Sequence, residues 1–102
     1  MIALRVKNQN KLHEKSIGLL GKKHPSAIYF QTRFGIHTFF MRFPIDVLIL
    51  DQNNMVVKLV ENLQPNKFFF WPPFFKQVIE LPSGELKRNK IKLGDKIHLQ
   101  FI

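Results

Sequence analysis

The chain has no cysteine and few acidic residues, and these two scarcities bound its chemistry. Without cysteine, no disulfide, zinc ribbon, thiol nucleophile or iron–sulfur cluster can form. Seven Asp and Glu residues face sixteen Lys and Arg residues, so the formal net charge is +9. Such an excess favours an anionic partner, either nucleic acid or an acidic protein, although general basicity also keeps a protein soluble without marking a site.

Motifs for nucleotide, metal and serine chemistry are also missing. The five glycines form neither a dinucleotide fingerprint nor a phosphate-binding loop. No serine lies in a nucleophile elbow, and no pair of histidines has the spacing of metal ligands. We therefore expect no metal and no cofactor.

Long hydrophobic runs are absent as well. No apolar run approaches the length that a membrane-spanning helix needs. Residues 1–7 lack the basic-then-apolar pattern of an export signal. We expect a cytoplasmic protein without a transmembrane segment.

The apolar residues that are present are arranged mainly as strands. With 102 residues, 45% of them hydrophobic, the chain is long enough for one domain over residues 1–102 with a real core. Alternation at residues 2–7 and 96–102 is typical of half-buried strands. An apolar strand, a polar turn and a returning strand predict a β-hairpin at residues 46–61. Further strands are expected at residues 27–30, 36–42 and 76–81.

Two short helices complete the expected fold. Asn10 can cap a helix over residues 11–20, and Ser83 can cap a helical turn around residues 84–89. The predicted fold class is mainly β (α+β): a compact antiparallel sheet or a partly closed, barrel-like domain with one or two short helices.

The run at residues 37–51 places one His, one Arg and one Asp in an otherwise apolar stretch. In a strand, His37 and Met41 share one face, and Arg42 lies on the other. A proline bend follows, which can bring Asp46 near His37 or near Arg42. A carboxylate beside an imidazole is one route to a general base, whereas an Arg42–Asp46 ion pair would only satisfy two charges at the mouth of the core. The ion pair is the stronger expectation.

Glu80 lies in a second apolar segment, on the same strand face as Val78. An apolar flank raises the pKa of a carboxyl group, as an acid catalyst requires. His37, Asp46 and Glu80 are therefore the candidate catalytic residues of an enzyme acting on a small substrate. That hypothesis requires the three side chains to converge on one pocket.

Six aromatic residues surround a Pro-Pro pair at residues 68–75. The prolines exclude a helix or a central strand, so this segment is a loop or an edge. Exposed rings would stack on bases, enter a membrane interface or anchor a protein partner; alternatively, the rings fold back as a lid over the sheet, which we favour. Our candidate ligand contacts are Arg42, Met41 and Trp71, because Trp71 can close a pocket and also touch a ligand.

Several segments in order resemble the prokaryotic family known as domain of unknown function 192, also called uncharacterised protein family 0127. The specific segment is the Phe-Met-(basic)-x-Pro-Ile-Asp block at residues 40–46. Matching segments also occur at residues 18–20, 80–84 and 94–95, and at Pro65. Lys15 and Leu20 depart from the Arg and Met that many relatives carry, so we give that segment no role beyond packing. The resemblance implies a compact β-rich fold of about this length, and it implies no reaction, substrate or cofactor.

The sequence thus supports a leading function and two alternatives. We expect a small basic, non-catalytic binding domain that engages an anionic or polymeric partner, because charge and loop aromatics come without a complete catalytic set. The first alternative is the enzyme described above. In the second, the motif residues serve only the fold of an accessory or structural protein.

Overall fold

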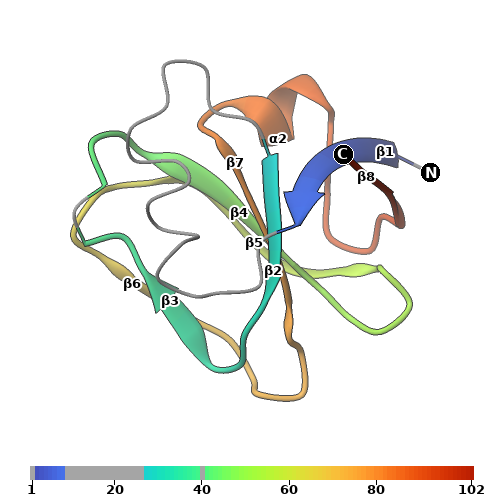
Figure 1. Ribbon diagram of the computed structural model, residues 1–102, viewed down its shortest axis with the longest axis horizontal. Helices are drawn as coiled ribbons and strands as arrows, with labels where there is room; N and C mark the ends of the chain where they lie inside the picture. The colour runs from blue at the N-terminus through green and yellow to red at the C-terminus, as the bar shows by residue number, and fades with distance from the viewer. Residues whose placement is uncertain (1, 9–26, 40) are drawn as a thin grey trace.

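A central sheet of six strands organises the protein (Figure 1). The computed structural model describes residues 2–8, 27–39 and 41–102. Its elements are β1 (Ile2–Asn8), β2 (Ala27–Gln31), β3 (Gly35–His37), β4 (Ile45–Leu50), β5 (Val56–Leu63), β6 (Phe68–Phe70), β7 (Gln77–Pro82), α2 (Glu85–Arg88) and β8 (Ile97–Phe101). Within those described ranges, no helix is long and apolar enough to cross a membrane. The expected helix at residues 11–20 lies outside them.

The prediction of a mainly β fold is confirmed, but the sheet is mixed rather than antiparallel. The strand order is β5-β4-β7-β2-β1-β8, and the sheet is open rather than closed into a barrel. β5, β4, β7 and β2 pair antiparallel, whereas β1 pairs in parallel with both β2 and β8. Long stretches of chain separate β1 from both of these partners. They permit a parallel direction, which a tight hairpin turn forbids.

The antiparallel half of the sheet follows the local sequence pattern. The hairpin predicted at residues 46–61 is confirmed as β4 and β5, and every residue of β4 is buried. One carboxylate oxygen of Asp51 closes the turn, because it accepts hydrogen bonds from the backbone N–H groups of Asn53 (2.8 Å) and Met55 (3.0 Å). The strand predicted at residues 76–81 is confirmed as β7, which lies between β4 and β2.

Each face of the sheet carries its own apolar core. Alternate residues of β7 show the division, since Val78 belongs to one core and Ile79 to the other. The helix side, which contains Ile79, also contains Leu86 of α2. The ribbon side, which contains Val78, is covered by the two-stranded sheet β3–β6 and includes Ile36 and Trp71. In Figure 1, β3 and β6 lie together, well apart from α2.

The strand predicted at residues 36–42 stops after His37, so the expected alternation of faces is wrong. Thr38 fixes the chain at this point, since its backbone N–H donates to the carbonyl of Lys67 (2.9 Å). Its buried hydroxyl accepts a hydrogen bond from the Lys67 N–H (2.9 Å). As a result, His37 is exposed while Met41 is buried in the ribbon-side core.

Candidate functional site

Asp46 is a buried structural clamp. Its carboxylate is 0% exposed and accepts three backbone hydrogen bonds, from the N–H groups of Asn62 (2.8 Å), Gly84 (3.0 Å) and Leu86 (3.0 Å). These bonds hold the end of β5 and the first turn of α2, and they satisfy a charge that burial would otherwise penalise. The predicted capping role of Ser83 is wrong. The N-cap residue is Gly84, and the Ser83 hydroxyl donates to the side chain of Asn62.

The predicted ion pair between Arg42 and Asp46 is also wrong. Arg42 is exposed, and among the described residues no salt bridge joins it to Asp46. The physical reason is that three backbone amides already occupy the Asp46 carboxylate. Arg42 therefore adds its charge to the surface.

The structure does not bring His37, Asp46 and Glu80 together. In the register of β4 and β7, Asp46 pairs with Leu81 of the helix side, whereas Glu80 pairs with Val47 of the ribbon side. Paired residues of antiparallel strands share a face, so the two carboxylates point to opposite sides of the sheet. Glu80 is 2% exposed, whereas His37 is at the surface. The hollows lined by His37 and by Asp46 have no residue in common.

Metal binding also lacks a ligand set in the part of the chain that the structure describes. Within residues 2–8, 27–39 and 41–102, no group of three or more His, Asp or Glu side chains lies close enough together to hold a metal ion.

The aromatic segment at residues 68–75 divides between lid and surface. Trp71 is buried in the ribbon-side core, and its indole N–H donates to the carbonyl of Phe75 (2.8 Å). Phe69 and Phe75 pack against the same core. Phe68 and Phe70, in contrast, are 58% and 60% exposed. Trp71, Phe69 and Phe75 therefore form the lid over the sheet. Phe68 and Phe70 are instead part of the surface.

The exposed rings of β6 join others to form one surface, here called the aromatic face (Phe34, His37, Phe39, Phe68 and Phe70). His37 stacks on Phe39 at 4.9 Å between ring centroids, and Phe39 meets Phe68 edge-on at 4.9 Å. Phe68 stacks on Phe70 at 5.6 Å with only 10° between the ring planes. Phe34, which is 63% exposed, lines a groove of about 190 Å³ together with Phe68 and Phe70.

Gly35 makes room for the Phe70 ring on this face. The two residues are paired in the β3–β6 register. A Cβ atom at Gly35 would lie 2.5 Å from Cδ1 of Phe70 and 2.7 Å from the backbone oxygen of Phe69. Real Cβ atoms essentially never come so close, so only glycine lets the ring lie over the strand.

The aromatic face lies among positive charges. Residues 27–39 and 64–76, which include β3, β6 and their flanking loops, contain no Asp or Glu. Lys58 of β5 donates a hydrogen bond to the carbonyl of Phe70, and its ammonium lies 5.0 Å from the centroid of the Phe69 ring. Arg33 lines the groove, and Lys67 directly precedes β6.

The other basic cluster, around α2, is partly neutralised. Arg88 forms a salt bridge with Glu85 at 2.7 Å, and Lys87 lies 4.0 Å from a carboxylate oxygen of Glu61. The basic residues around α2 therefore have acidic partners, whereas the two segments that carry the aromatic face contain no Asp or Glu.

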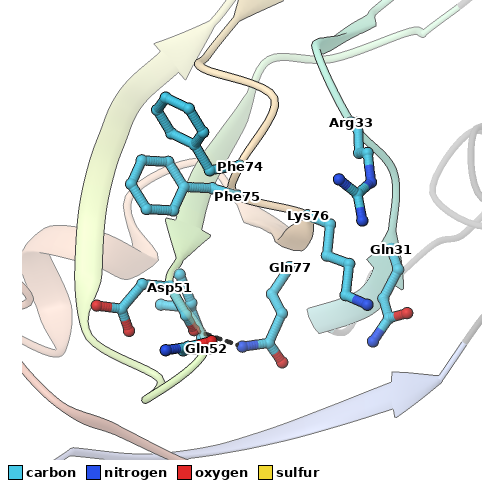
Figure 2. A pocket seen from close by; sticks show the side chains of 9 residues that line it. Gln31, Arg33, Asp51, Gln52, Phe74, Phe75, Lys76 and Gln77 are labelled. Carbon is cyan, nitrogen blue, oxygen red and sulfur yellow. Dashed lines mark hydrogen bonds between the residues drawn. The ribbon is translucent and has the colours of Figure 1, made fainter.

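A second hollow, here called the amide cleft, adjoins the groove (Figure 2). It has a volume of about 400 Å³ and is lined by Gln31, Arg33, Leu50, Asp51, Gln52, Phe74, Phe75, Lys76 and Gln77. Figure 2 shows Arg33, Lys76 and Gln31 on one side and Asp51 and Gln52 on the other. The Gln77 side chain is fixed by hydrogen bonds to the Asp51 carbonyl (2.7 Å) and from the Tyr29 hydroxyl (2.7 Å). Arg33 lines both hollows, so it connects the cleft to the aromatic face.

Sequence reasoning missed Arg33, Phe34 and Gly35. Their importance depends on the pairing of β3 with β6, which joins residues 31 to 35 positions apart, such as Gly35 and Phe70. Local periodicity does not report such a pairing. The absence of acidic residues from both segments is visible in the sequence and is the signal that could have linked them.

Comparison with known proteins identifies relatives in three Pyrococcus species. A UPF0127 protein of Pyrococcus abyssi is 43% identical over 70 residues, which cover 67% of this chain and 59% of the relative, less than two thirds of its length. A UPF0127 protein of Pyrococcus horikoshii is 37% identical over 90 residues, covering 82% of this chain and 77% of the relative. A third, from Pyrococcus furiosus, is 28% identical over 102 residues, covering 94% and 87%.

Two solved structures share the fold at 18% sequence identity. One is a protein of unknown function from Novosphingobium aromaticivorans, with a TM-score of 0.74 over 89% of this chain and 71% of that one. The other is a candidate transcription regulator from Sinorhizobium meliloti, with a TM-score of 0.76 over 89% and 78%. The family model DUF192, described as "Uncharacterized ACR", matches residues 2–99. The resemblance that the sequence motifs indicated is thus confirmed, and the chain belongs to the DUF192/UPF0127 family.

Proposed function

We propose that the protein is a small, basic, non-catalytic binding domain that engages an anionic polymer through the aromatic face. One observation carries the proposal: exposed rings lie among cations, on two segments of chain without an acidic residue. We also propose that it acts in the cytoplasm, as a single domain over residues 1–102, with nucleic acid or an acidic protein as its partner.

Exposed rings on one patch favour a binding role. Phe34, Phe68 and Phe70 are each more than half exposed and line the same groove. Large contiguous apolar surface is rarely left in water unless a partner covers it. The surrounding Lys and Arg residues attract anions over a distance of about one Debye length, roughly 10 Å at 0.1 M salt. Together these features fit a partner that is both charged and able to contact rings.

The enzyme alternative receives less support from the geometry. The two candidate carboxylates face opposite sides of the sheet, and Asp46 is fully engaged by backbone amides. Met41 and Trp71, two of the candidate ligand contacts, are buried in the ribbon-side core. These positions favour a role for the motif residues in the fold. We therefore assign binding to the aromatic face.

A salt titration tests the proposal. Fluorescently labelled heparin, an anionic polymer without bases, is titrated with the protein at about 50 mM and about 200 mM NaCl, and binding is followed by anisotropy. With about three ionic contacts, the affinity should fall at least about tenfold between the two salt concentrations. Absence of binding at the lower concentration, or an affinity that salt does not change, would refute the proposed function.

A further inference from the structure

We infer that the anionic partner is single-stranded nucleic acid, whose bases stack on Phe34, Phe68 and Phe70 while its phosphates contact Arg33 and Lys76. This inference rests on the proposed function and names the class of polymer that the same surface selects.

The geometry of the exposed rings favours stacking with flat ligands. Phe68 and Phe70 are nearly parallel, and both are open to solvent on the face that they share with the groove. Every base has a flat π-face, so an array of accessible rings binds unpaired bases with little sequence preference. The absence of a side chain at Gly35 leaves room for the Phe70 ring against β3, and that ring stacks on Phe68, so the two rings form one platform.

The backbone at Phe34 is strained. Phe34 has φ of 77°, a left-handed conformation that bulky residues rarely adopt. Its ring is 63% exposed, so the strain is not offset by burial in a core. A strained, exposed aromatic residue at the edge of a groove is consistent with a side chain kept for contact with a ligand.

Two cations continue from the groove into the amide cleft. Arg33 lines both the groove and the amide cleft, and Lys76 lines the cleft beside it (Figure 2). A strand whose bases lie in the groove would therefore carry its backbone past Arg33 toward Lys76. The apolar groove and the cationic cleft thus lie next to each other on the surface. A polymer that carries both flat rings and negative charges can contact the two at once.

Other polyanions match the surface less well. Duplex nucleic acid keeps its bases stacked on one another, so their faces are not available to the rings. Heparin has the charge but no aromatic rings to stack. An anionic membrane would attract the cations and accept the phenylalanines, but its headgroups offer no flat aromatic faces to stack on the rings.

The test compares ligands on ring-deleted variants. A labelled oligothymidylate of about 12 nucleotides, within the usual site size for one small domain, is titrated by anisotropy beside labelled heparin, a duplex of equal length and vesicles of anionic phospholipid. Phe68→Leu/Phe70→Leu removes two rings. Phe34→Asn removes the third with a residue that tolerates positive φ, so this variant should fold even if the double variant does not. Phe101→Leu is the matched control, because Phe101 is 53% exposed on β8, away from the groove.

We expect both groove variants to bind the oligonucleotide at least about fivefold more weakly, since stacking contributes about that factor or more for each base. Their affinity for heparin should be unchanged, as should the affinity of Phe101→Leu for every ligand. The duplex should bind more weakly than the single strand.

One contradicting result is that heparin and the oligonucleotide both bind in a salt-dependent way, with affinities that the ring deletions do not change. That result would overturn base stacking and leave the proposed function intact. Vesicle binding that needs the rings, without oligonucleotide binding, would assign the face to membranes and overturn the inference. Failure of every ligand to bind would refute the proposed function as well.

Discussion

Asp46 and Phe34 show how differently single residues act in this protein. Asp46 belongs to the sequence block that identifies the family, yet its carboxylate is fully engaged by three backbone amides. Its partners lie 16 to 40 residues away in the chain, so the sequence showed a polar residue in an apolar strand but not its role. Phe34 lies outside the family block, and its strained and exposed position appears only in the structure.

Replacement of Asp46 should therefore cost stability rather than binding. Asp46→Ala leaves three N–H groups without their acceptor, and we expect the free energy of unfolding to fall by about 3 kcal/mol or more. Asp46→Asn keeps one acceptor oxygen and should lose about 1–2 kcal/mol. Urea denaturation measures both changes. Asp95→Ala is the control, because the Asp95 carboxylate accepts one N–H, from Lys92, at 2.8 Å. An Asp46→Ala variant as stable as the unmodified protein would contradict the clamp.

Phe34→Asn should have the opposite effect on stability. Asn tolerates the left-handed conformation better than Phe, so we expect the free energy of unfolding to rise by about 1 kcal/mol while binding of the single-stranded oligonucleotide weakens. Phe74→Asn provides the comparison, since Phe74 is 79% exposed and does not have a positive φ. Thermal or urea unfolding reports the difference. Equal changes in the two variants would show that strain at Phe34 is not the cause.

At the scale of elements, the sequence predicted what is local and missed what is distant. The β4–β5 hairpin and β7 follow from apolar runs and turn residues within one segment. The parallel pairing of β1 with β2 and β8 does not, because direction there depends on packing across long stretches of chain. The pairing of β3 with β6, which creates the aromatic face, was missed for the same reason. Thr38, whose hydrogen bonds end β3, was assigned to the middle of a strand.

The β3–β6 pair gives a test of its own at Gly35. Gly35→Ala should lower the free energy of unfolding by about 1–3 kcal/mol, since the new methyl group meets the Phe70 ring and the Phe69 carbonyl. Adding Phe70→Ala removes the ring contact but not the carbonyl contact. The double variant should therefore lose less stability than the sum of the two single variants, as measured by urea denaturation. Strict additivity would mean that the ring does not lie over the glycine.

On the scale of the whole molecule, the sheet separates two kinds of basic surface. On the helix side, lysine and arginine around α2 have acidic neighbours. The ribbon side presents rings and cations from segments without Asp or Glu. The net charge of +9 follows from the composition alone. Its uneven distribution over the two sides of the sheet could not be predicted without the fold. The central claim is that location, and not total charge, decides where an anionic polymer binds.

Two variants with the same loss of charge test this claim most directly. Arg33→Gln/Lys76→Gln changes the cations beside the aromatic face, and Lys90→Gln/Lys92→Gln changes two lysines that line a hollow near α2. The affinity of each variant for labelled heparin is measured by anisotropy over a range of NaCl concentrations. We predict at least about tenfold weaker binding for the first variant, with a salt slope lower by about one to two ionic contacts, and a change of less than about twofold for the second. Equal losses in the two variants, or a larger loss in the second, would contradict the account.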